Sequence, residues 1–501
     1  MGEQKMLRRK LIDDTFWGFV AVMINRVGSL FLTVILARFF LPRNYGLYSL
    51  VLSTALLFYV LADLGINKAL VRYLSHSLAY EKKKIKSYYT YFRRLKLLMS
   101  VGASLLLLVF AWPISHLFFK NTELFYPLLV SAMYIFILTL EEFYAQIFFI
   151  VEKIKYSAMK ESINFILRAI FIFIVFYLIS KEFQIFGIFA FFSIAAFFVF
   201  LFNFFLSKKL LPEFDGKDVG SIDKKKILAF VGYLSIASIS TVLFSHVDSI
   251  MLGFFIGPEF VGYYRVAFSL VFGVLGFVAF PNVFLLPVFT KLEKSETEKV
   301  FAHSFRYMSL LTIPMITGIL LVGRYFISIF YGELYLPGVN SLYILSLIIF
   351  PAMGVGLLLS LFSSKERPKI FAVLIVLTGV LNIFLNFVLI KLFLRYSPEL
   401  GILGASIATT ISWYFYFIFS FYAAKRKLKY SLSFPDLLRP IFSSAIMAGI
   451  LWVLFNKIQN MNLALGLIEI ILGAAIYFVV MILIGGLTKQ DLEIVKMGFR
   501  R

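Results

Sequence analysis

The chain has 501 residues, of which 61% are hydrophobic and 15% are charged, and its mean hydropathy is +0.91. A soluble globular domain is about 45–50% apolar and about 25% charged, so this composition excludes an ordinary soluble enzyme and a disordered chain. The 49 Lys and Arg residues outnumber the 27 Asp and Glu residues, and the absence of cysteine removes disulfides, thiolate metal ligands and thiol nucleophiles.

Fourteen apolar runs in the chain are long enough to cross a membrane. A bilayer core of about 30 Å takes about 20 mostly apolar residues per helix. The gaps between the runs are short, and the two longest gaps, 67–95 and 207–226, are polar and basic. In chain order, the predicted spans are residues 12–38, 47–66, 96–115, 123–150, 160–180, 185–206, 227–254, 259–288, 303–332, 339–363, 370–391, 401–424, 438–456 and 464–486.

The basic residues alternate from one side of these spans to the other. With the N-terminus inside, every inner segment carries at least three Lys or Arg residues, and no outer loop carries more than two. Cytoplasmic segments of membrane proteins carry such an excess, so we predict an all-α protein of the cell membrane with fourteen transmembrane helices and both ends inside. Most of the net charge of +22 is then explained by the orientation of the chain in the membrane and by contact with anionic lipid headgroups. We therefore expect no nucleic-acid partner.

A turn after the first predicted span repeats after the seventh. Pro42, Gly46 and Tyr48 recur as a proline, a glycine and a tyrosine at a constant offset of 216 residues. Parallel repeats of this kind are typical of transporters, with the substrate site at the repeat interface. We therefore predict two six-helix bundles, residues 1–210 and 211–430, related by a pseudo-two-fold axis along the membrane normal. Residues 431–501 hold two further helices and an amphipathic cytoplasmic tail.

The sequences around these turns resemble a known family. Two segments look like the opening of the polysaccharide transport family, namely ARFFLPRNYGLY at 37–48 and ADLGINKALVR at 62–72. A third, DSIMLGFFIGPEFVGYYRVA at 248–267, is similar to the family's turn between its seventh and eighth helices. These proteins are the Wzx-type flippases of the multidrug/oligosaccharidyl-lipid/polysaccharide exporter superfamily. Fourteen spans match this family and the related lipid II flippases, whereas multidrug exporters of the superfamily usually have twelve.

The resemblance implies a monomeric flippase that carries a lipid-linked oligosaccharide. Its substrate is a glycan on a polyprenyl or dolichyl phosphate-type carrier, moved from the cytoplasmic to the outer leaflet by alternating access for cell-surface polysaccharide or glycoprotein biosynthesis. The carrier tail would lie in the bilayer, in a groove beside the last two helices. The chain has no Walker A motif, which leaves an ion (Na⁺ or H⁺), the membrane potential or the substrate gradient as the driving force. We expect no metal or cofactor.

Two alternatives to the flippase stay open. One is an ion-coupled multidrug exporter of the same superfamily, and the other is a membrane glycan polymerase. The predicted outer loops are too short for an outer catalytic domain, so the sequence favours a transporter over an enzyme.

Arginines within the spans are the candidate substrate ligands, because an ionisable side chain in a membrane is costly and indicates function. Arg26 lies near the middle of the first span, with no acidic residue within one helical turn. Together with Arg38 and Arg265, it is a candidate for contacting a substrate phosphate. The alternative for Arg26 is an ion pair with an acid on another helix.

Acidic residues within the spans are candidates for gating or coupling. Asp248 and Arg265 lie at similar predicted depths, with His246 nearby, and they form either a structural pair or a gate that substrate phosphate opens. Glu141 and Glu142 match Arg168 on the next span, so we predict at least one Glu–Arg pair, with proton or cation coupling as the alternative.

Polar residues and prolines complete the set. Asp63 stands at the inner end of the second span, where it interacts with the helix end or with a gate. Asn382 and Asn386 are one turn apart on one helix face, and they either bond across helices or line a polar path. Four prolines interrupt predicted spans and permit bending, namely Pro281, Pro287, Pro314 and Pro351.

Overall fold

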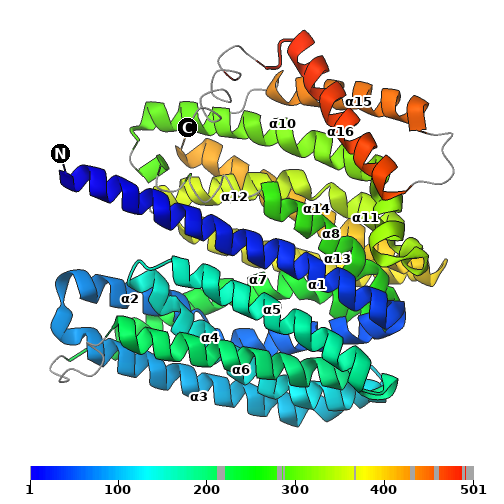
Figure 1. Cartoon of the computed structure of the whole chain (residues 1–501). Coiled ribbons are helices and arrows are strands. Elements are labelled where there is room, and N and C mark those ends of the chain that lie inside the picture. Colours follow the sequence, from blue (N-terminus) through cyan, green and yellow to red (C-terminus); the bar gives the residue numbers. More distant parts are fainter. Residues whose placement is uncertain are drawn as a thin grey trace. The chain divides into compact units, whose positions relative to one another are not determined.

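Every regular element in the described part of this computed structural model is a helix (Figure 1). The structure describes residues 2–211, 221–278, 285, 288–290, 292–365, 368–428, 435–455, 462–487 and 491. The long helices are α1 (Gly2–Asp63), α2 (Ile66–Tyr80), α3 (Ile85–Trp112), α4 (Phe125–Ile150), α5 (Lys155–Leu178), α6 (Gln184–Leu210), α7 (Lys224–Phe255), α8 (Pro258–Val278), α10 (Lys294–Phe326), α11 (Val339–Ser346), α12 (Ile349–Ser364), α13 (Pro368–Leu394), α14 (Pro398–Leu428), α15 (Pro435–Phe455) and α16 (Leu463–Leu483).

The chain is a multi-pass membrane protein. Twelve of the described helices are long and apolar enough to cross a membrane, and the number is thirteen if the bent pair Glu333–Ser346 and Ile349–Ser364 forms one span. The first two predicted spans both lie in α1, which breaks at Leu41 (φ 62°, ψ 170°) just before Pro42. The total of fourteen spans and the inside position of both ends stay predictions.

The chain divides into two compact units. One comprises residues 1–265 and 375–401, and the other comprises residues 266–374 and 402–501. These boundaries differ from the predicted bundles 1–210 and 211–430, which follow the repeat; the bundle division stays a prediction. The predicted amphipathic tail lies outside the described residues apart from Asp491, as do Pro281 and Pro287.

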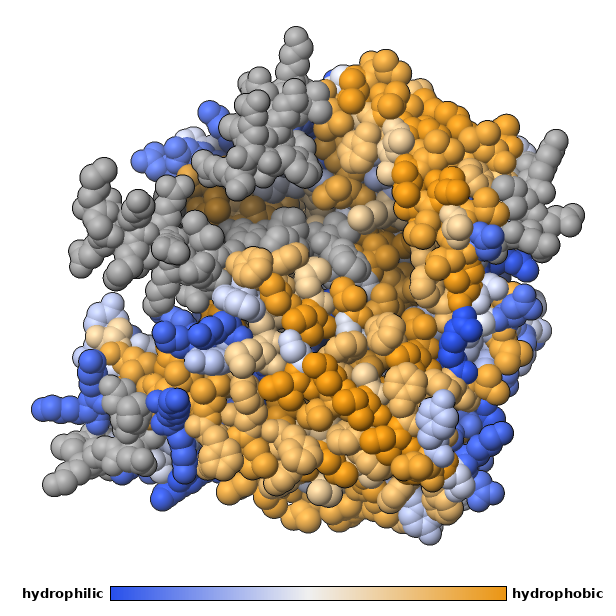
Figure 2. All heavy atoms as spheres, in the orientation of Figure 1, coloured by the Kyte–Doolittle hydropathy of each residue, from blue (hydrophilic) through white to orange (hydrophobic). Residues whose placement is uncertain are grey.

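In the first unit, apolar side chains face outward and polar side chains face inward, as expected for a protein surrounded by lipid. On α3, the exposed positions include Leu98 and Val109, whereas Lys96, Ser100 and Ser104 are buried. Lipid tails are as apolar as leucine, so the leucines face outward, and the small and polar residues form the helix contacts. Figure 2 shows hydrophobic side chains along the middle of these helices and hydrophilic residues at their ends.

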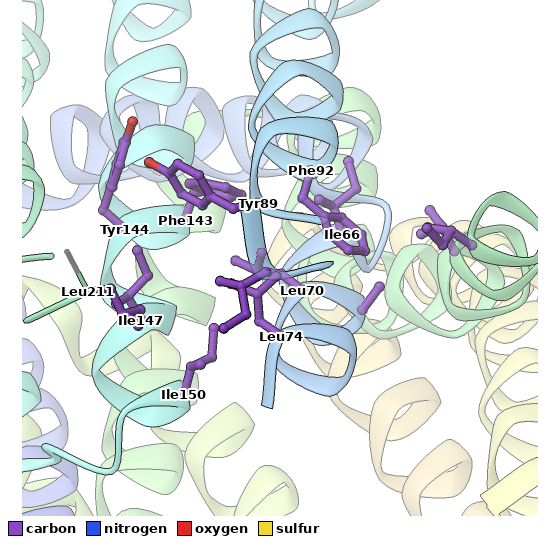
Figure 3. Close-up of a cluster of buried hydrophobic side chains, with 14 residues drawn as sticks. Ile66, Leu70, Leu74, Tyr89, Phe92, Phe143, Tyr144, Ile147, Ile150 and Leu211 are labelled. Carbon is purple, nitrogen blue, oxygen red and sulfur yellow. The ribbon is translucent and has the colours of Figure 1, made fainter. Parts of the chain in front are cut away.

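Helices α3, α4 and α6 lie side by side in this unit, with α1 packed on α5 (Figure 1). A cluster of buried apolar side chains joins α2, α3 and α4 (Figure 3), and Leu70, Phe92 and Ile147 are among its fully buried members. This cluster fixes α2 although that helix belongs to a segment predicted to be a basic loop.

The second unit packs α10 against α12, α15 and α16. Its apolar core there includes Leu310, Met447, Leu451 and Tyr477, and the Tyr477 hydroxyl donates to the Leu310 carbonyl at 2.9 Å. Pro314 lies inside α10, and Pro351 lies in the first turn of α12, next to the 42° bend.

Candidate functional site

Arg26 is held on α1 by contacts of its neighbours with α5. The Asn25 amide donates to Glu161 Oε2 at 2.9 Å, and Gly28 lies so close to α5 that an added Cβ would be 2.8 Å from the Phe165 ring. The Arg26 side chain is exposed, and within the described residues it has no ion pair or side-chain hydrogen bond. The interhelical acid partner considered for Arg26 is therefore not present among these residues, and its guanidinium is available to a ligand.

The other two candidate cations differ from Arg26. Arg38 is exposed on α1, and Arg265 is half-buried on α8. The His246 ring nitrogen Nδ1 lies 3.2 Å from Ser53 Oγ on the second half of α1.

Glu141 and Glu142 pair with Lys160, not with Arg168 as predicted. Lys160 Nζ lies 3.5 Å from Glu141 Oε1, 2.8 Å from Glu142 Oε1 and 3.2 Å from Glu161 Oε1. Lys160 is 5% exposed and Glu141 is fully buried. The predicted span begins at Lys160, whereas α5 begins at Lys155, so this lysine lies inside the helix. One positive charge thus faces three carboxylates, and the cluster has an excess of negative charge.

Arg168 has a different set of partners. Its Nη2 donates to the Tyr134 hydroxyl at 2.8 Å, and its guanidinium carbon lies 5.1 Å from the centre of the Phe192 ring. In the described part of the chain, no carboxylate lies within ion-pair distance of Arg168. Aromatic and hydroxyl contacts therefore take the place of the predicted Glu–Arg pair.

Asp63 forms an ion pair that the sequence did not reveal. Lys96 Nζ lies 2.7 Å from Asp63 Oδ1, and the lysine side chain is fully buried. Asp63 also accepts hydrogen bonds from the backbone N–H groups of Gly65 and Asn67 at the start of α2. The predicted span begins at residue 96, whereas α3 begins at Ile85, so Lys96 lies inside a helix and not at its start. Lys96, Ser100 and Ser104 are four residues apart and so lie on one helix face. This spacing is the sequence feature that indicates a buried polar face on α3.

Asp248 lies in a buried polar network on α7. It accepts hydrogen bonds from the Tyr264 hydroxyl at 2.5 Å and from the Asn386 amide at 2.7 Å. The same amide of Asn386 also donates to the Asn382 carbonyl at 3.0 Å. Asn386 thus bonds across helices, one of the two predicted possibilities, while the interaction of Asp248 with Arg265 stays a prediction.

Arg306 in the second unit is bound by the C-terminal tail. Its Nη2 donates to Asp491 Oδ2 at 2.6 Å and to the Gly486 carbonyl at 2.8 Å. The Tyr307 hydroxyl donates to Asp491 Oδ1 at 2.6 Å. Asp491 lies 185 residues from Arg306 along the chain. No local sequence pattern links residues so far apart, so the sequence alone does not predict the partner of Arg306.

An apolar cavity of about 340 Å³ lies among α10, α15 and α16. Glu469 is its one acidic lining residue; it is 4% exposed, and its Oε2 has no hydrogen-bond partner among the described residues. Gly318 also lines the cavity, and an added Cβ there would meet no atom within 4 Å. The described residues contain no cluster of three or more His, Asp or Glu arranged to hold a metal.

The sequence profile of the polysaccharide biosynthesis protein family matches residues 11–293, more than half of the chain. The chain belongs to this family. The match confirms the predicted resemblance, and it includes Arg26, the Lys160 cluster and Asp248.

Two relatives of this family member are similar over long stretches. The uncharacterized membrane protein MJ1068 of Methanocaldococcus jannaschii is 21% identical over 444 residues, which cover 84% of this chain and 85% of the relative. The probable low-salt glycan biosynthesis flippase Agl15 of Haloferax volcanii is 24% identical over 273 residues, which cover 52% of this chain and 54% of the relative.

Solved structures show the same fold. The lipid II flippase MurJ, in an inward closed conformation, aligns with a TM-score of 0.74 at 18% identity, over 92% of this chain and 97% of its own. An inward-facing multidrug resistance MATE family transporter aligns with a TM-score of 0.56 at 13% identity, over 83% of this chain and 95% of its own. The polysaccharide biosynthesis protein described here therefore has the MurJ and MATE fold.

Proposed function

We propose that this protein is a flippase for a lipid-linked oligosaccharide, which it moves from the cytoplasmic to the outer leaflet by alternating access. Family membership, the flippase relative Agl15 and the MurJ fold support a transporter of lipid-linked glycans and not an enzyme. The polyprenyl or dolichyl phosphate-type carrier and the direction of movement are part of the proposal.

The observation that supports phosphate binding is the Arg26 side chain, which has no ion pair among the described residues. An arginine in an apolar helix costs free energy, and within the described residues no acid offsets the charge of Arg26. Binding of a phosphate or diphosphate would offset it, because guanidinium and phosphate form bidentate, charge-assisted hydrogen bonds. Arg265 and Arg38 are proposed as further cations on the same path, with Asp248 as the group that phosphate displaces from Arg265.

The carrier tail is proposed to bind the cavity among α10, α15 and α16. Its lining is apolar apart from Glu469, with Leu310, Pro314 and Met447 among the lining residues. An isoprenoid chain is apolar and flexible, so it can fill such a cavity by van der Waals packing, and only the apolar area that it removes from water adds a hydrophobic gain. The proposal rests on the resemblance to the lipid II flippases, which implies a groove for the carrier tail beside the last two helices.

The Lys160 cluster is proposed as the coupling site for Na⁺ or H⁺. Both carboxylate oxygens of Glu141 lack hydrogen-bond partners among the described residues, and the side chain is fully buried. Three carboxylates around one ammonium leave negative charge that a bound cation or proton would neutralise.

Reconstitution in liposomes with a fluorescent lipid-linked oligosaccharide tests the function. The flippase should expose the labelled headgroup to a membrane-impermeant quencher faster than protein-free liposomes do. No translocation, combined with uptake of a cationic dye by the same vesicles, would favour the multidrug exporter, which the MATE fold accommodates.

A further inference from the structure

The predicted basic loop 67–95 is an ordered part of the first unit. Helix α2 is followed by the short helix Lys82–Lys84 and then by α3. The apolar face of α2 contributes Ile66, Leu70 and Leu74 to the buried cluster with Phe92 and Ile147 (Figure 3). Burial of three aliphatic side chains fixes the helix, so the residues on its other face are held in place.

That other face forms one wall of a polar cavity of about 590 Å³. Small-molecule sites are clefts of about 300–1,000 Å³, so the cavity has the size of a binding site. Its walls come from α2, from the start of α3 and from the start of α7. The charged and aromatic side chains that line it include Arg72, Tyr73, Lys84, Tyr88 and Lys226.

The acids of this cavity already have partners. Glu81 Oε1 lies 3.1 Å from Lys84 Nζ. Asp223 Oδ1 accepts the backbone N–H of Lys226 at 3.0 Å and so caps the start of α7. Within the described residues, neither the Arg72 guanidinium nor the Lys226 ammonium has an ion pair or a hydrogen bond. The lining thus carries three cations and two acids, and two of the cations, Arg72 and Lys226, are not in an ion pair within the described residues.

One of these cations, Arg72, lies against an aromatic ring. The Arg72 guanidinium carbon lies 4.5 Å above the centre of the Phe230 ring. A cation–π contact of this kind restrains the guanidinium, and its N–H groups have no hydrogen-bond partner among the described residues. The Tyr73 and Tyr88 rings stack at 5.4 Å, with 30° between their planes, and form an adjacent wall. A guanidinium fork and an ammonium group that line one cavity are the groups that proteins use to bind phosphate.

We propose that this cavity binds a phosphate-bearing anion, with Arg72 as the bidentate ligand and Lys226 as the second cation. The same chemistry is supplied by the headgroup of an anionic lipid and by a soluble phosphorylated compound. The site lies at the polar ends of α2, α3 and α7, and it does not depend on the proposed flippase function.

The test uses the full-length protein in phosphatidylcholine nanodiscs. One arm adds phosphatidic acid and counts retained lipid by native mass spectrometry, and the other titrates pyrophosphate into nanodiscs without phosphatidic acid. The variant Arg72→Gln/Lys226→Gln is compared with Lys83→Gln/Lys225→Gln, a control with two exposed lysines in the same segments that do not line the cavity. The first variant should weaken binding at least about tenfold, and the control should stay within about twofold of the wild type.

The two arms separate the sources of the phosphate. Retention of phosphatidic acid that depends on Arg72 and Lys226 assigns the site to a lipid headgroup, and pyrophosphate binding alone with the same dependence assigns it to a soluble compound. Arg72→Lys keeps the charge but loses the fork, so it should lie between the wild type and the double variant. Equal binding by the double variant and the lysine control, for both probes, would overturn the proposal.

Discussion

Gly46 lies against the carbonyl oxygen of Pro258, so closely that an added Cβ would be 1.7 Å from it. The relationship is reciprocal, because a Cβ at Gly262 would be 2.2 Å from the carbonyl oxygen of Pro42. The two turns are the ones that match at an offset of 216 residues. Such mutual contacts, in which each segment meets the other through the same positions, are typical of a local two-fold relation. The repeated turn therefore has a structural counterpart, while its extension to six-helix bundles stays a prediction.

Gly46→Ala and Gly262→Ala should each lower thermal stability, because the neighbouring atom is backbone and cannot rotate away. Overpacking of this kind costs about 1–3 kcal/mol, occasionally more. The control is Gly102→Ala on α3, where an added Cβ meets no atom within 4 Å, and helix propensity predicts a small gain there. Thermal unfolding of the purified protein in detergent measures all three, and equal melting temperatures would contradict the close contact.

Helices were predictable from this sequence because long apolar runs in a bilayer must satisfy their own backbone hydrogen bonds. The positions where some of these helices begin were not predictable, because charged residues continue the helices beyond the apolar runs. Helix α3 begins at Ile85, not at residue 96, and α5 begins at Lys155, not at residue 160. Lys96 and Lys160 were consequently placed at the first residue of their predicted spans, although both are buried in ion pairs inside helices.

The charged residues of the candidate site were predictable, but their partners were not. Spacing within one helix identifies residues on a shared face, as it did for Asn382 and Asn386. Partners on other helices depend on helix rotation and packing, which a single sequence does not contain. Arg306 therefore had no identifiable acid before the structure placed Asp491 next to it.

Lys96→Met should destabilise the protein strongly, because it leaves the Asp63 carboxylate without its buried cation. Removing one member of a buried pair costs about 3–5 kcal/mol, whereas replacing both members is often close to neutral. The double variant Asp63→Asn/Lys96→Met should therefore recover most of the loss in a double-mutant cycle. The exposed pair of Lys84 and Glu81 is the control, with an expected coupling of about 0–1 kcal/mol. Coupling no larger for Asp63–Lys96 than for this surface pair would refute the prediction.

Lys160→Gln should lower both the amount of folded protein and its thermal stability, because three carboxylates would then face one another without a cation. Lys153→Gln, at an exposed position seven residues earlier in the chain, is the control and should change little. If the cluster binds a coupling ion, adding Na⁺ or lowering the pH should partly restore Lys160→Gln. Thermal unfolding across Na⁺ concentrations and pH values measures this, and no response to either ion would count against coupling at the cluster.

Gly318→Leu should reduce carrier binding by filling the cavity among α10, α15 and α16. The new side chain enters open space, since no atom lies within 4 Å of the added Cβ, so the fold should be retained. Gly449→Leu on α15 also meets no atom within 4 Å and does not line the cavity, which makes it a matched control. Native mass spectrometry with a polyprenyl phosphate should show less retained lipid for Gly318→Leu alone. Equal retention by both variants would remove the cavity from the carrier site.

Arg26→Gln should abolish flipping of the labelled oligosaccharide while leaving the amount of protein and its melting temperature close to those of the wild type. The reason is that Arg26 has no structural partner among the described residues, so its removal takes away a phosphate ligand and no internal contact. Arg26→Lys keeps the charge without the bidentate geometry and should retain partial activity. Arg43→Gln is the control on the same helix, because Arg43 is already bound bidentately by Glu123 at 2.8 and 3.0 Å. The liposome quenching assay separates the outcomes: wild-type flipping by Arg26→Gln, or an equal loss in Arg43→Gln, would show that Arg26 has no specific part in transport.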